Sequence, residues 1–442
     1  MDTAIAGAGP TGLFAAIALA RRGHAVTIVD RDPGPAPGGE WPRRGVMQFH
    51  HPHGLRKQIV EILGAELPDL IDALLAAGAE LAVVPADDTH PELMVGMHCG
   101  RVTFERVLRA AAVAEPGVTF AVGHADAVLR SRGRAAGLLV DGVELPAELV
   151  LDASGRAGRI GTDLRAPGLG ADCGLAYVSR PYALLPGAEP GPVNAPIGLI
   201  ARMHGYFFAA FLQDNRGINV VLARPSADRE LAGLRVTGAF EAAMRAIPGL
   251  DVWTDPARTR PVSGVLVGGN LRNTYRGQLD EHGRVALPGL VHVGDAVCTT
   301  NPTSGRGITT SLQQAQQLIA LIDRAPTDPE AVTLEFDRWC AERIKPWFDD
   351  HLAWDADQVR QWAGEDVDLS RPLTSGHIVD AAQAEPALMA VVGPYLAMDA
   401  LPATLAEVEP RAREIFAGGW RPPVPPGPTR DDLAALLVGS ST

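Results

Sequence analysis

Residues 3–30, TAIAGAGPTGLFAAIALARRGHAVTIVD, decide the fold of this chain. An apolar run at 3–6 and another at 25–29 predict two buried strands. Between them, Leu13–Arg22 has helical character and stops at Gly23, a typical helix end. The segment is therefore predicted to form a β-α-β unit. The turn from the first strand into the helix carries three glycines, Gly7, Gly9 and Gly12.

The spacing of these glycines, GxGxxG, is typical of a turn that binds a dinucleotide. Gly7 permits the tight turn, Gly9 lets a pyrophosphate approach the backbone, and Gly12 lets the helix pack closely on the strand. The phosphates would lie at the helix N-terminus, where free N–H groups favour anions. Asp30 ends the second strand, at the place where a carboxylate can bind both ribose hydroxyls of an adenosine. Strand, turn, helix and acid together favour a dinucleotide site over a glycine turn without a ligand.

A second motif lies almost 300 residues later, in the stretch VGDAVCTTNPTSGRGIT at 293–309. Asp295 follows an apolar strand, and its carboxylate can accept hydrogen bonds from a polyol such as a ribityl chain. Gly305 and Gly307 precede a helix, and such a helix start tolerates the negative charge of a reduced flavin. The presence of both motifs at the two ends of one domain points to FAD rather than NAD.

The remaining pattern predicts an α/β protein with a discontinuous FAD domain. Short aromatic and β-branched runs within 166–285 predict a mostly antiparallel second sheet. We therefore expect a Rossmann-like, three-layer FAD-binding domain at 1–165 and 286–325, interrupted by a substrate-binding sheet at 166–285. Residues 326–442 are expected to form a C-terminal helical segment with a Pro-rich tail, in which 421–430 crosses the surface as an extended strap.

Composition argues against several classes of protein. The chain has 442 residues and a formal net charge of -13, so binding to nucleic acid or to an anionic membrane surface is not expected. No apolar run is long enough to span a membrane. The four cysteines form no CxxC pair, which is typical of structural thiols in a reducing compartment. We expect a cytoplasmic enzyme.

The motifs resemble those of FAD-dependent oxidoreductases with the para-hydroxybenzoate hydroxylase fold, a family that includes aromatic hydroxylases, epoxidases and flavin halogenases. The likeness is strongest to bacterial monooxygenases related to the epoxidases. Further matching stretches are VDRDP at 29–33, RRGV at 43–46, GRVTFERVLRAA at 100–111 and LDASGR at 151–156.

This resemblance implies hydroxylation or epoxidation of an apolar or aromatic small molecule through a flavin C4a-hydroperoxide. NADPH or NADH would supply the electrons, directly or through a separate flavin reductase. The resemblance also implies which residues contact FAD. Its adenosine and pyrophosphate half would contact Gly7, Gly9, Thr11, Gly12, Asp30 and Arg31. Its ribityl and isoalloxazine half would contact Arg44, Arg101, Asp295, Pro302, Gly305, Gly307 and Ile308.

One departure from the family pattern concerns the electron donor. The family usually has Ala-Asp-Gly in its middle motif, whereas this chain has Ala153-Ser154-Gly155 and places the acid at Asp152. Because the family uses that motif for both FAD and NADPH, Ser154 weakens the case for direct reduction by NADPH.

Catalytic residues are not identified by the sequence. His50, His51 and His53 form a dense group, which is interpreted either as part of a structural loop near the flavin or as a source of one proton-transfer or substrate-contacting histidine. No further ligands accompany them locally, so no metal is expected. Aromatic residues of the second sheet, from Tyr177 to Phe211, are expected in part to face the flavin.

Three other functions stay open at this stage. A dehydrogenase or reductase on the same fold would use the same cofactor site. A halogenase is disfavoured because Lys57 and Lys345 are the only lysines and neither has the expected setting. A non-catalytic flavin-binding protein is compatible with Ser154, but it does not explain the intact Pro302–Gly307 segment.

Overall fold

The computed structural model describes residues 1–36, 38–85 and 92–439. At its centre lies a five-stranded parallel sheet with the order β19-β10-β1-β2-β6. The crossovers place β1 in the middle of the sheet, so that the turn after β1 opens at its carboxyl edge. Its strands are β1 (Asp2–Ala6), β2 (Ala25–Asp30), β6 (Val118–Val122), β10 (Leu149–Asp152) and β19 (Leu290–His292).

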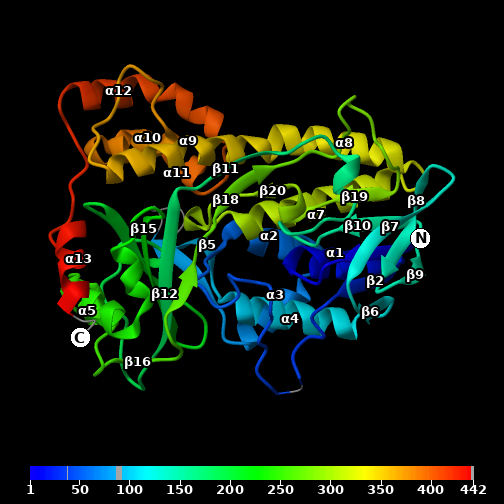
Figure 1. Cartoon of the computed structure of the whole chain (residues 1–442), viewed down its shortest axis with the longest axis horizontal. Helices are drawn as coiled ribbons and strands as arrows, with labels where there is room; N and C mark the ends of the chain where they lie inside the picture. The colour runs from blue at the N-terminus through cyan, green and yellow to red at the C-terminus, as the bar shows by residue number, and fades with distance from the viewer. Residues whose placement is uncertain (37, 86–91, 440–442) are drawn as a thin grey trace.

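Two different layers cover the faces of this sheet (Figure 1). Side chains alternate along a strand, so Ile5 packs toward the helices while Ala4 and Ala6 pack toward the opposite layer. The expected three-layer α/β fold is confirmed. The helical layer contains α1 (Pro10–Ala20), α4 (Arg101–Ala114) and α7 (Gly307–Arg324), and the opposite layer is the antiparallel sheet of β7 (Ala125–Ser131), β8 (Arg134–Val140) and β9 (Val143–Pro146).

A small sheet beside α2 was not expected from the sequence. It has the order β3-β5-β4 and precedes α4 in the chain. The apolar spacing of residues 54–63 is typical of a helix, but Leu55–Arg56 forms strand β3 because it pairs with Met97 and Gly96. The helix starts only at Lys57. The elements are β3 (Leu55–Arg56), α2 (Lys57–Glu66), α3 (Asp69–Ala76), β4 (Glu80–Pro85) and β5 (Glu92–His98).

The second large sheet is antiparallel, with the order β13-β14-β15-β12-β16 and with β17 also paired to β12. One face packs on α5 (Thr237–Ala246), α6 (Leu250–Trp253) and the C-terminal helix α13 (Arg430–Gly439). Its strands are β12 (Leu175–Leu184), β13 (Gly198–Met203), β14 (Tyr206–Leu212), β15 (Gly217–Pro225), β16 (Thr259–Pro261) and β17 (Leu266–Gly268).

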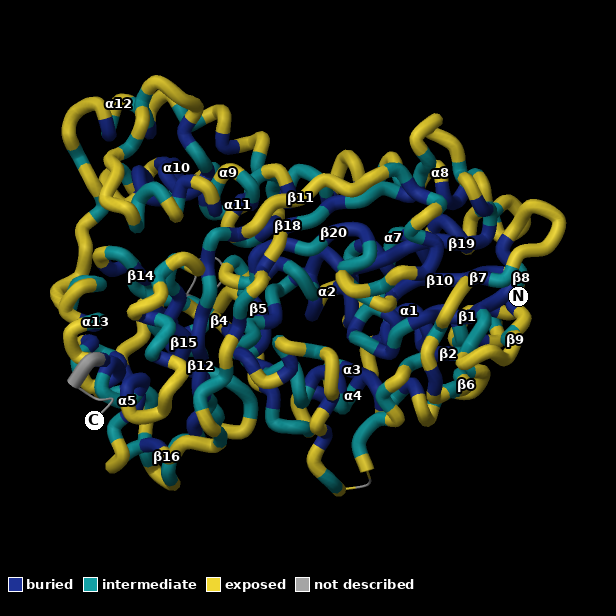
Figure 2. Tube along the Cα trace, viewed as in Figure 1, coloured by how far each residue is buried: buried dark blue, intermediate teal, exposed yellow. Residues whose placement is uncertain are grey.

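A narrow antiparallel sheet of β11 (Leu169–Asp172), β18 (Arg272–Tyr275) and β20 (Cys298–Thr299) lies against helix α9 (Lys345–Trp362), where Asn273 of β18 donates a hydrogen bond to Asp355. Because β18 precedes the return to the central sheet and β20 follows it, this ribbon ties the two parts of the chain together. In Figure 2, dark blue marks the buried residues of α1, α7 and the central sheet, whereas β11 at the edge of this ribbon is exposed.

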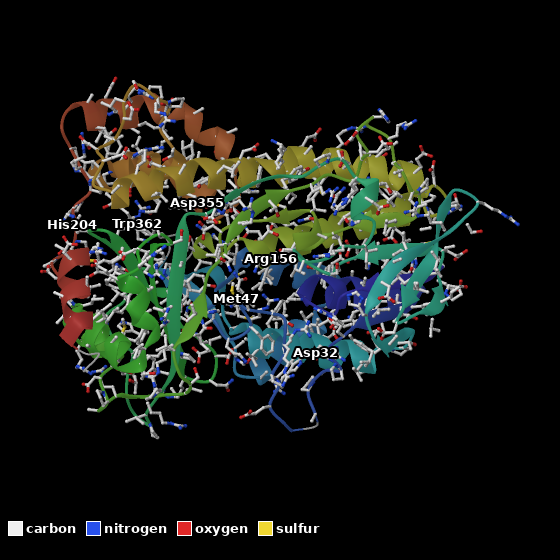
Figure 3. All side chains as sticks on the ribbon, in the orientation of Figure 1. Asp32, Met47, Arg156, His204, Asp355 and Trp362 are labelled. Atoms are coloured by element: carbon white, nitrogen blue, oxygen red, sulfur yellow. The ribbon has the colours of Figure 1, made fainter. Side chains whose placement is uncertain are left out.

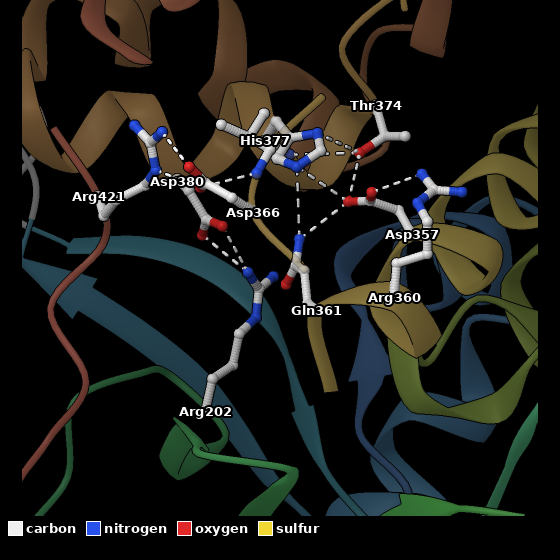
Figure 4. A network of polar contacts seen from close by, with 10 residues as sticks. Arg202, Asp357, Arg360, Gln361, Asp366, Thr374, His377, Asp380 and Arg421 are labelled. Carbon is white, nitrogen blue, oxygen red and sulfur yellow. Dashed lines mark hydrogen bonds and ion pairs between the residues drawn. The ribbon is translucent and has the colours of Figure 1, made fainter. Parts of the chain in front are cut away.

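The C-terminal segment is helical, as expected. Its ion pair between Arg202 of β13 and Asp380 of α10, at 2.7 Å, joins it to the second sheet (Figure 4). After α12 the chain crosses as an extended strap and ends in α13, where Leu433 is fully buried beside α5. The helices are α8 (Pro329–Arg343), α9 (Lys345–Trp362), α10 (Ser375–Ala384), α11 (Met389–Leu396) and α12 (Glu409–Ala417). Within the described ranges, no helix combines the length and the apolar character that crossing a membrane requires.

Candidate functional site

The first glycine turn has one open position between two closed ones. Gly7 has φ +106°, and a Cβ there would lie 2.4 Å from the Ala153 carbonyl oxygen. A Cβ at Gly12 would lie 2.0 Å from the Gly7 oxygen, so the start of α1 packs directly on the turn. A Cβ at Gly9 would meet nothing within 4 Å. Gly9 also begins α1 without a side-chain cap, so the first helical N–H groups are free to bind an anion.

Asp30 fixes the shape of this turn. Its Oδ2 accepts a hydrogen bond from the Ala8 N–H at 2.6 Å, and its Oδ1 accepts one from the Asp32 N–H at 2.8 Å. Each carboxylate oxygen has a further lone pair for a ligand hydroxyl. Arg31, next in the chain, is exposed.

Arg43 reaches the glycine turn from the long loop, and its neighbour Arg44, the residue predicted to contact the cofactor, points to solvent. Arg44 is exposed, whereas Arg43 is buried and donates to the Ala8 carbonyl at 2.6 Å. The Arg43 Nε lies 2.7 Å from Glu105, a fully buried carboxylate of α4 that also accepts from Arg101. Glu105 thus orients two arginines. The RRGV pattern gives both arginines the same local signal, so the sequence analysis missed Arg43 and Glu105.

The two motifs meet at Thr11 and Gly294. A Cβ at Gly294 would lie 2.8 Å from the Thr11 Oγ1, so the start of α1 packs against the turn that holds Asp295. Among the described residues, the Asp295 carboxylate has one hydrogen bond, a 3.5 Å contact from the Ser311 hydroxyl, while the Thr299 hydroxyl donates to the Asp295 backbone carbonyl at 3.2 Å. Burial raises the pKa of Asp295, although the charges of Arg101 and Arg156 act in the opposite direction. Figure 3 labels Arg156 near the middle of the molecule, between the two large sheets.

The loop that follows Asp295 exposes its backbone on one side. Gly305 has φ +61°, and a Cβ at Gly305 or at Gly307 would meet nothing within 4 Å. Pro302 is half-buried, and Ile308 packs partly buried against the helical face of the central core. The free backbone at the start of α7 therefore faces open space.

Residues 152–155, Asp-Ala-Ser-Gly, where the chain departs from the family pattern, form a local hydrogen-bond network. Ser154 donates both its hydroxyl and its N–H to Asp152. The other Asp152 oxygen binds His292 Nδ1 at 2.7 Å, and both of these side chains are buried. Burial lowers the pKa of His292, which keeps this imidazole neutral. Asp152 therefore braces β10 against β19, directly below the turn at Gly7.

The clustered histidines do not converge on one site. His51 contacts the Ser179 hydroxyl at 2.8 Å through Nδ1 and also the Val267 backbone, and burial lowers its pKa to about 4. His53 bonds the His51 carbonyl, and burial followed by the charge of Arg101 lowers its pKa to about 3. Both histidines are neutral at pH 7. No metal-binding group of three or more His, Cys, Asp or Glu residues occurs in the described ranges.

Because side chains alternate along a strand, the aromatic residues of the second sheet lie on two opposite faces of it. Tyr206 and Phe208 pack toward α5. Tyr177, Phe207 and Phe211 lie on the opposite face, the one from which Tyr177 also contacts the His51 ring with 4.8 Å between the ring centroids. This second face therefore lies toward the loop that follows Asp30.

These residues fit an FAD. Gly9 leaves room for a pyrophosphate, and Asp30 can accept ribose hydroxyls. The Asp295 carboxylate is half-buried and has, among the described residues, one long hydrogen bond of 3.5 Å, as expected for a group that completes its hydrogen bonds with a ligand hydroxyl. The open backbone at Gly305 and Gly307 would accommodate a flat ring.

Comparison with known proteins gives a family match for the N-terminal part of the chain and a fold match for nearly all of it. Residues 2–159 match the family described as FAD dependent oxidoreductase. A 98-residue stretch is 34% identical to the NAD-dependent dihydropyrimidine dehydrogenase subunit PreT of Salmonella typhimurium strain LT2. That match spans 22% of this chain and 23% of PreT, less than a quarter of the relative's length.

The solved structures extend the likeness over nearly the whole chain. The flavin-dependent brominase Bmp2 has 15% identity and a TM-score of 0.63, and the alignment covers 95% of this chain and 100% of that one. PqsL of Pseudomonas aeruginosa, a probable FAD-dependent monooxygenase, has 16% identity and a TM-score of 0.59 over 82% of this chain and 98% of that one. At these identities the likeness establishes the fold.

Proposed function

We propose that this chain binds FAD and oxygenates an apolar or aromatic small molecule, because residues 2–159 match the family described as FAD dependent oxidoreductase and the fold is similar to that of a flavin-dependent brominase and a probable FAD-dependent monooxygenase. The observation that carries the proposal is the meeting of both motifs at Thr11 and Gly294, which joins a pyrophosphate turn to a ribityl-binding carboxylate. Bound FAD supplies the oxygen-activating chemistry.

In this proposal the protein residues bind, orient and exclude water. The N-terminus of α1 holds the pyrophosphate, and Asp30 and Asp295 accept the ribose and ribityl hydroxyls. Arg101, oriented by Glu105, contributes positive charge close to Asp295. The aromatic face with Tyr177, Phe207 and Phe211 supplies an apolar wall for the substrate. Hydroxylation and epoxidation are both compatible with such a wall.

Halogenation is the weaker alternative, although Bmp2 shares the fold. A catalytic lysine needs an activated, unpaired amine. Lys57 is paired with Asp399 at 2.6 Å and Lys345 with Asp349 at 2.8 Å, so both amines are neutralised by carboxylates. These are the two lysines of the chain. A dehydrogenase or reductase would share the FAD contacts and differs in what it does with oxygen.

The electron donor is proposed to be NADPH or NADH, either directly or through a flavin reductase. Ser154 donates its hydrogen bonds to Asp152 within its own turn, so it takes the place of the family carboxylate without supplying a charge. This arrangement favours delivery of electrons through a reductase.

A single series of spectra tests the proposal. The purified protein, loaded with FAD, is mixed in air with NADPH, NADH or FAD reduced by an unrelated reductase, and with candidate aromatic substrates. Oxygen uptake coupled to an oxygenated product supports monooxygenation. Substrate oxidation without incorporation of ¹⁸O₂ indicates a dehydrogenase, and a brominated product with added bromide indicates a halogenase. A protein that takes up no FAD refutes the proposal.

A further inference from the structure

The loop at 301–307 is anchored by side chains that lie far along the chain. Its two glycines face open space, but the residue between them, Arg306, turns the other way and is 2% exposed. The backbone of the loop is therefore presented on one side and held from the other. The carboxylates and the tyrosine that anchor it come from α9 and α11, in the C-terminal helical segment, and Asn273 of β18 and Arg56 of β3 add further contacts.

Arg306 is held at one end of the loop by a closed set of contacts. Its guanidinium pairs with Asp350 of α9 at 2.8 Å and donates to the Tyr395 hydroxyl at 2.7 Å. The Tyr395 hydroxyl in turn donates to Asp350 at 2.7 Å. The Trp347 ring lies 4.6 Å from the guanidinium carbon, so the arginine also stacks on an aromatic face.

Asp355, one and a half turns further along α9, holds the other end. Its Oδ1 accepts from the Asn301 amide at 2.7 Å, and its Oδ2 accepts from Asn273 at 2.7 Å. Asn273 closes the set by accepting the Asn301 backbone N–H at 2.7 Å. All three side chains are buried.

Arg56 supports the middle of the loop. It donates to the Ser304 carbonyl at 2.7 Å, to the Gly305 carbonyl at 3.2 Å and to the Leu396 carbonyl of α11 at 2.6 Å. Burial lowers the pKa of Arg56 to about 10, and it stays protonated at pH 7. The loop is thus fixed at both ends and along its backbone.

We propose that α9 positions the loop at 301–307 for the flavin. Asp350 and Asp355 are then positioning residues, which hold the backbone of residues 302–307 in one place beside the isoalloxazine. This rests on the proposed function. Burying two carboxylates and an arginine is a costly way to pack helices, and apolar side chains serve packing alone at least as well. Such a network gains its value where a backbone must be held within about 0.5 Å of one geometry.

The test uses apo-protein and FAD-loaded protein of Asp350→Asn and Asp355→Asn. Each change keeps the shape of the side chain but replaces one carboxylate oxygen by an NH₂ group. This group faces N–H or O–H donors of the network, which then have no acceptor at that position. We expect FAD affinity, measured by flavin fluorescence quenching, to fall about 10- to 100-fold, since an unpaired buried charged hydrogen bond is worth about 1.5–3 kcal/mol. The visible circular dichroism of the bound flavin should change as well.

The matched control is Asp380→Asn. Asp380 is a buried carboxylate of the neighbouring helix α10, and it pairs with Arg202 away from the loop. Its variant should bind FAD within about twofold of the wild type. Thermal unfolding of each apo-protein monitors the fold. If Asp355→Asn does not fold, Asp350→Asn and Tyr395→Phe decide the matter by the same criteria, because Tyr395→Phe keeps the ring and removes only the hydroxyl.

Unchanged FAD affinity and circular dichroism in folded Asp350→Asn and Tyr395→Phe would overturn the inference. An equal loss in Asp380→Asn would also overturn it, because that result reflects general weakening of the helical segment. Failure of the proposed function is distinct, since the wild-type protein itself would then bind no FAD.

Discussion

Gly9→Ala should separate cofactor binding from folding. Gly9 has φ -80°, which alanine adopts without strain, and its Cβ would meet no protein atom within 4 Å. Losing a flexible glycine stabilises the folded state by about 0.4–1 kcal/mol, and placing alanine at a helix N-cap costs a similar amount. The free energy of unfolding of the apo-protein should therefore stay within about 1 kcal/mol of wild type.

The same substitution should weaken the affinity for FAD. The added methyl group occupies the space through which the pyrophosphate would approach the N-terminus of α1. Loss of one or two charge-assisted hydrogen bonds costs about 3 kcal/mol, which is about 100-fold in affinity. Urea unfolding of the apo-protein and fluorescence titration with FAD measure the two effects separately.

Two further substitutions make the comparison decisive. Gly12→Ala places its Cβ 2.0 Å from the Gly7 oxygen and should destabilise the apo-protein by about 3 kcal/mol. Gly238→Ala, in α5, also meets nothing within 4 Å and should leave FAD affinity unchanged. If Gly9→Ala binds FAD as tightly as Gly238→Ala does, no pyrophosphate passes close to Gly9 and the assignment of the turn is wrong.

Three other outcomes follow from the buried charges. Arg43→Ala should lower the free energy of unfolding by about 3 kcal/mol, because the buried Glu105 loses a partner. Replacing the exposed neighbour, Arg44→Ala, should change that free energy by less than about 0.5 kcal/mol. Equal urea midpoints of the two variants would contradict this reasoning. Burial raises the pKa of Asp295 above its unfolded value, so the wild-type apo-protein should gain stability as the pH falls through that raised pKa. In Asp295→Asn, thermal unfolding should no longer show this gain in stability. The same variant should bind FAD about tenfold more weakly. The pKa of His51 is lowered from 6.5 to about 4, so its protonation favours the unfolded chain and stability should fall as the pH drops below 6.5; an equally steep fall in His51→Gln would show that other groups cause it.

The sequence predicted the β-α-β unit at the start of the chain well because that unit is built from local patterns. The β-α-β unit around the GxGxxG turn depends on short apolar runs and on glycine positions, and β1, α1 and β2 lie within a few residues of the expected bounds. The pair Asp141-Gly142 is typical of a hairpin turn, and both residues have positive φ where β8 joins β9. Local signals of this kind do not depend on distant residues.

Long-range pairing explains what the sequence analysis missed. Residues 55–56 lie inside a helical pattern but form a strand, because β5 offers an edge forty residues later. Arg43 and Arg44 are neighbours with one chemistry, and only the buried Glu105 of α4 determines which of them turns inward. No local pattern identifies that partner.

What the sequence by itself determined is the α/β class, the two glycine turns before α1 and α7 and the order of the segments, since glycine spacing and apolar periodicity are properties of short stretches. The tertiary structure alone decided which charges meet. It brought Asp350 and Asp355 of a C-terminal helix beneath the loop of the second motif, and it sorted the aromatic residues of the second sheet between two faces. A buried charge becomes stable only where a partner from another element reaches it, and that partner is chosen by packing across the whole chain.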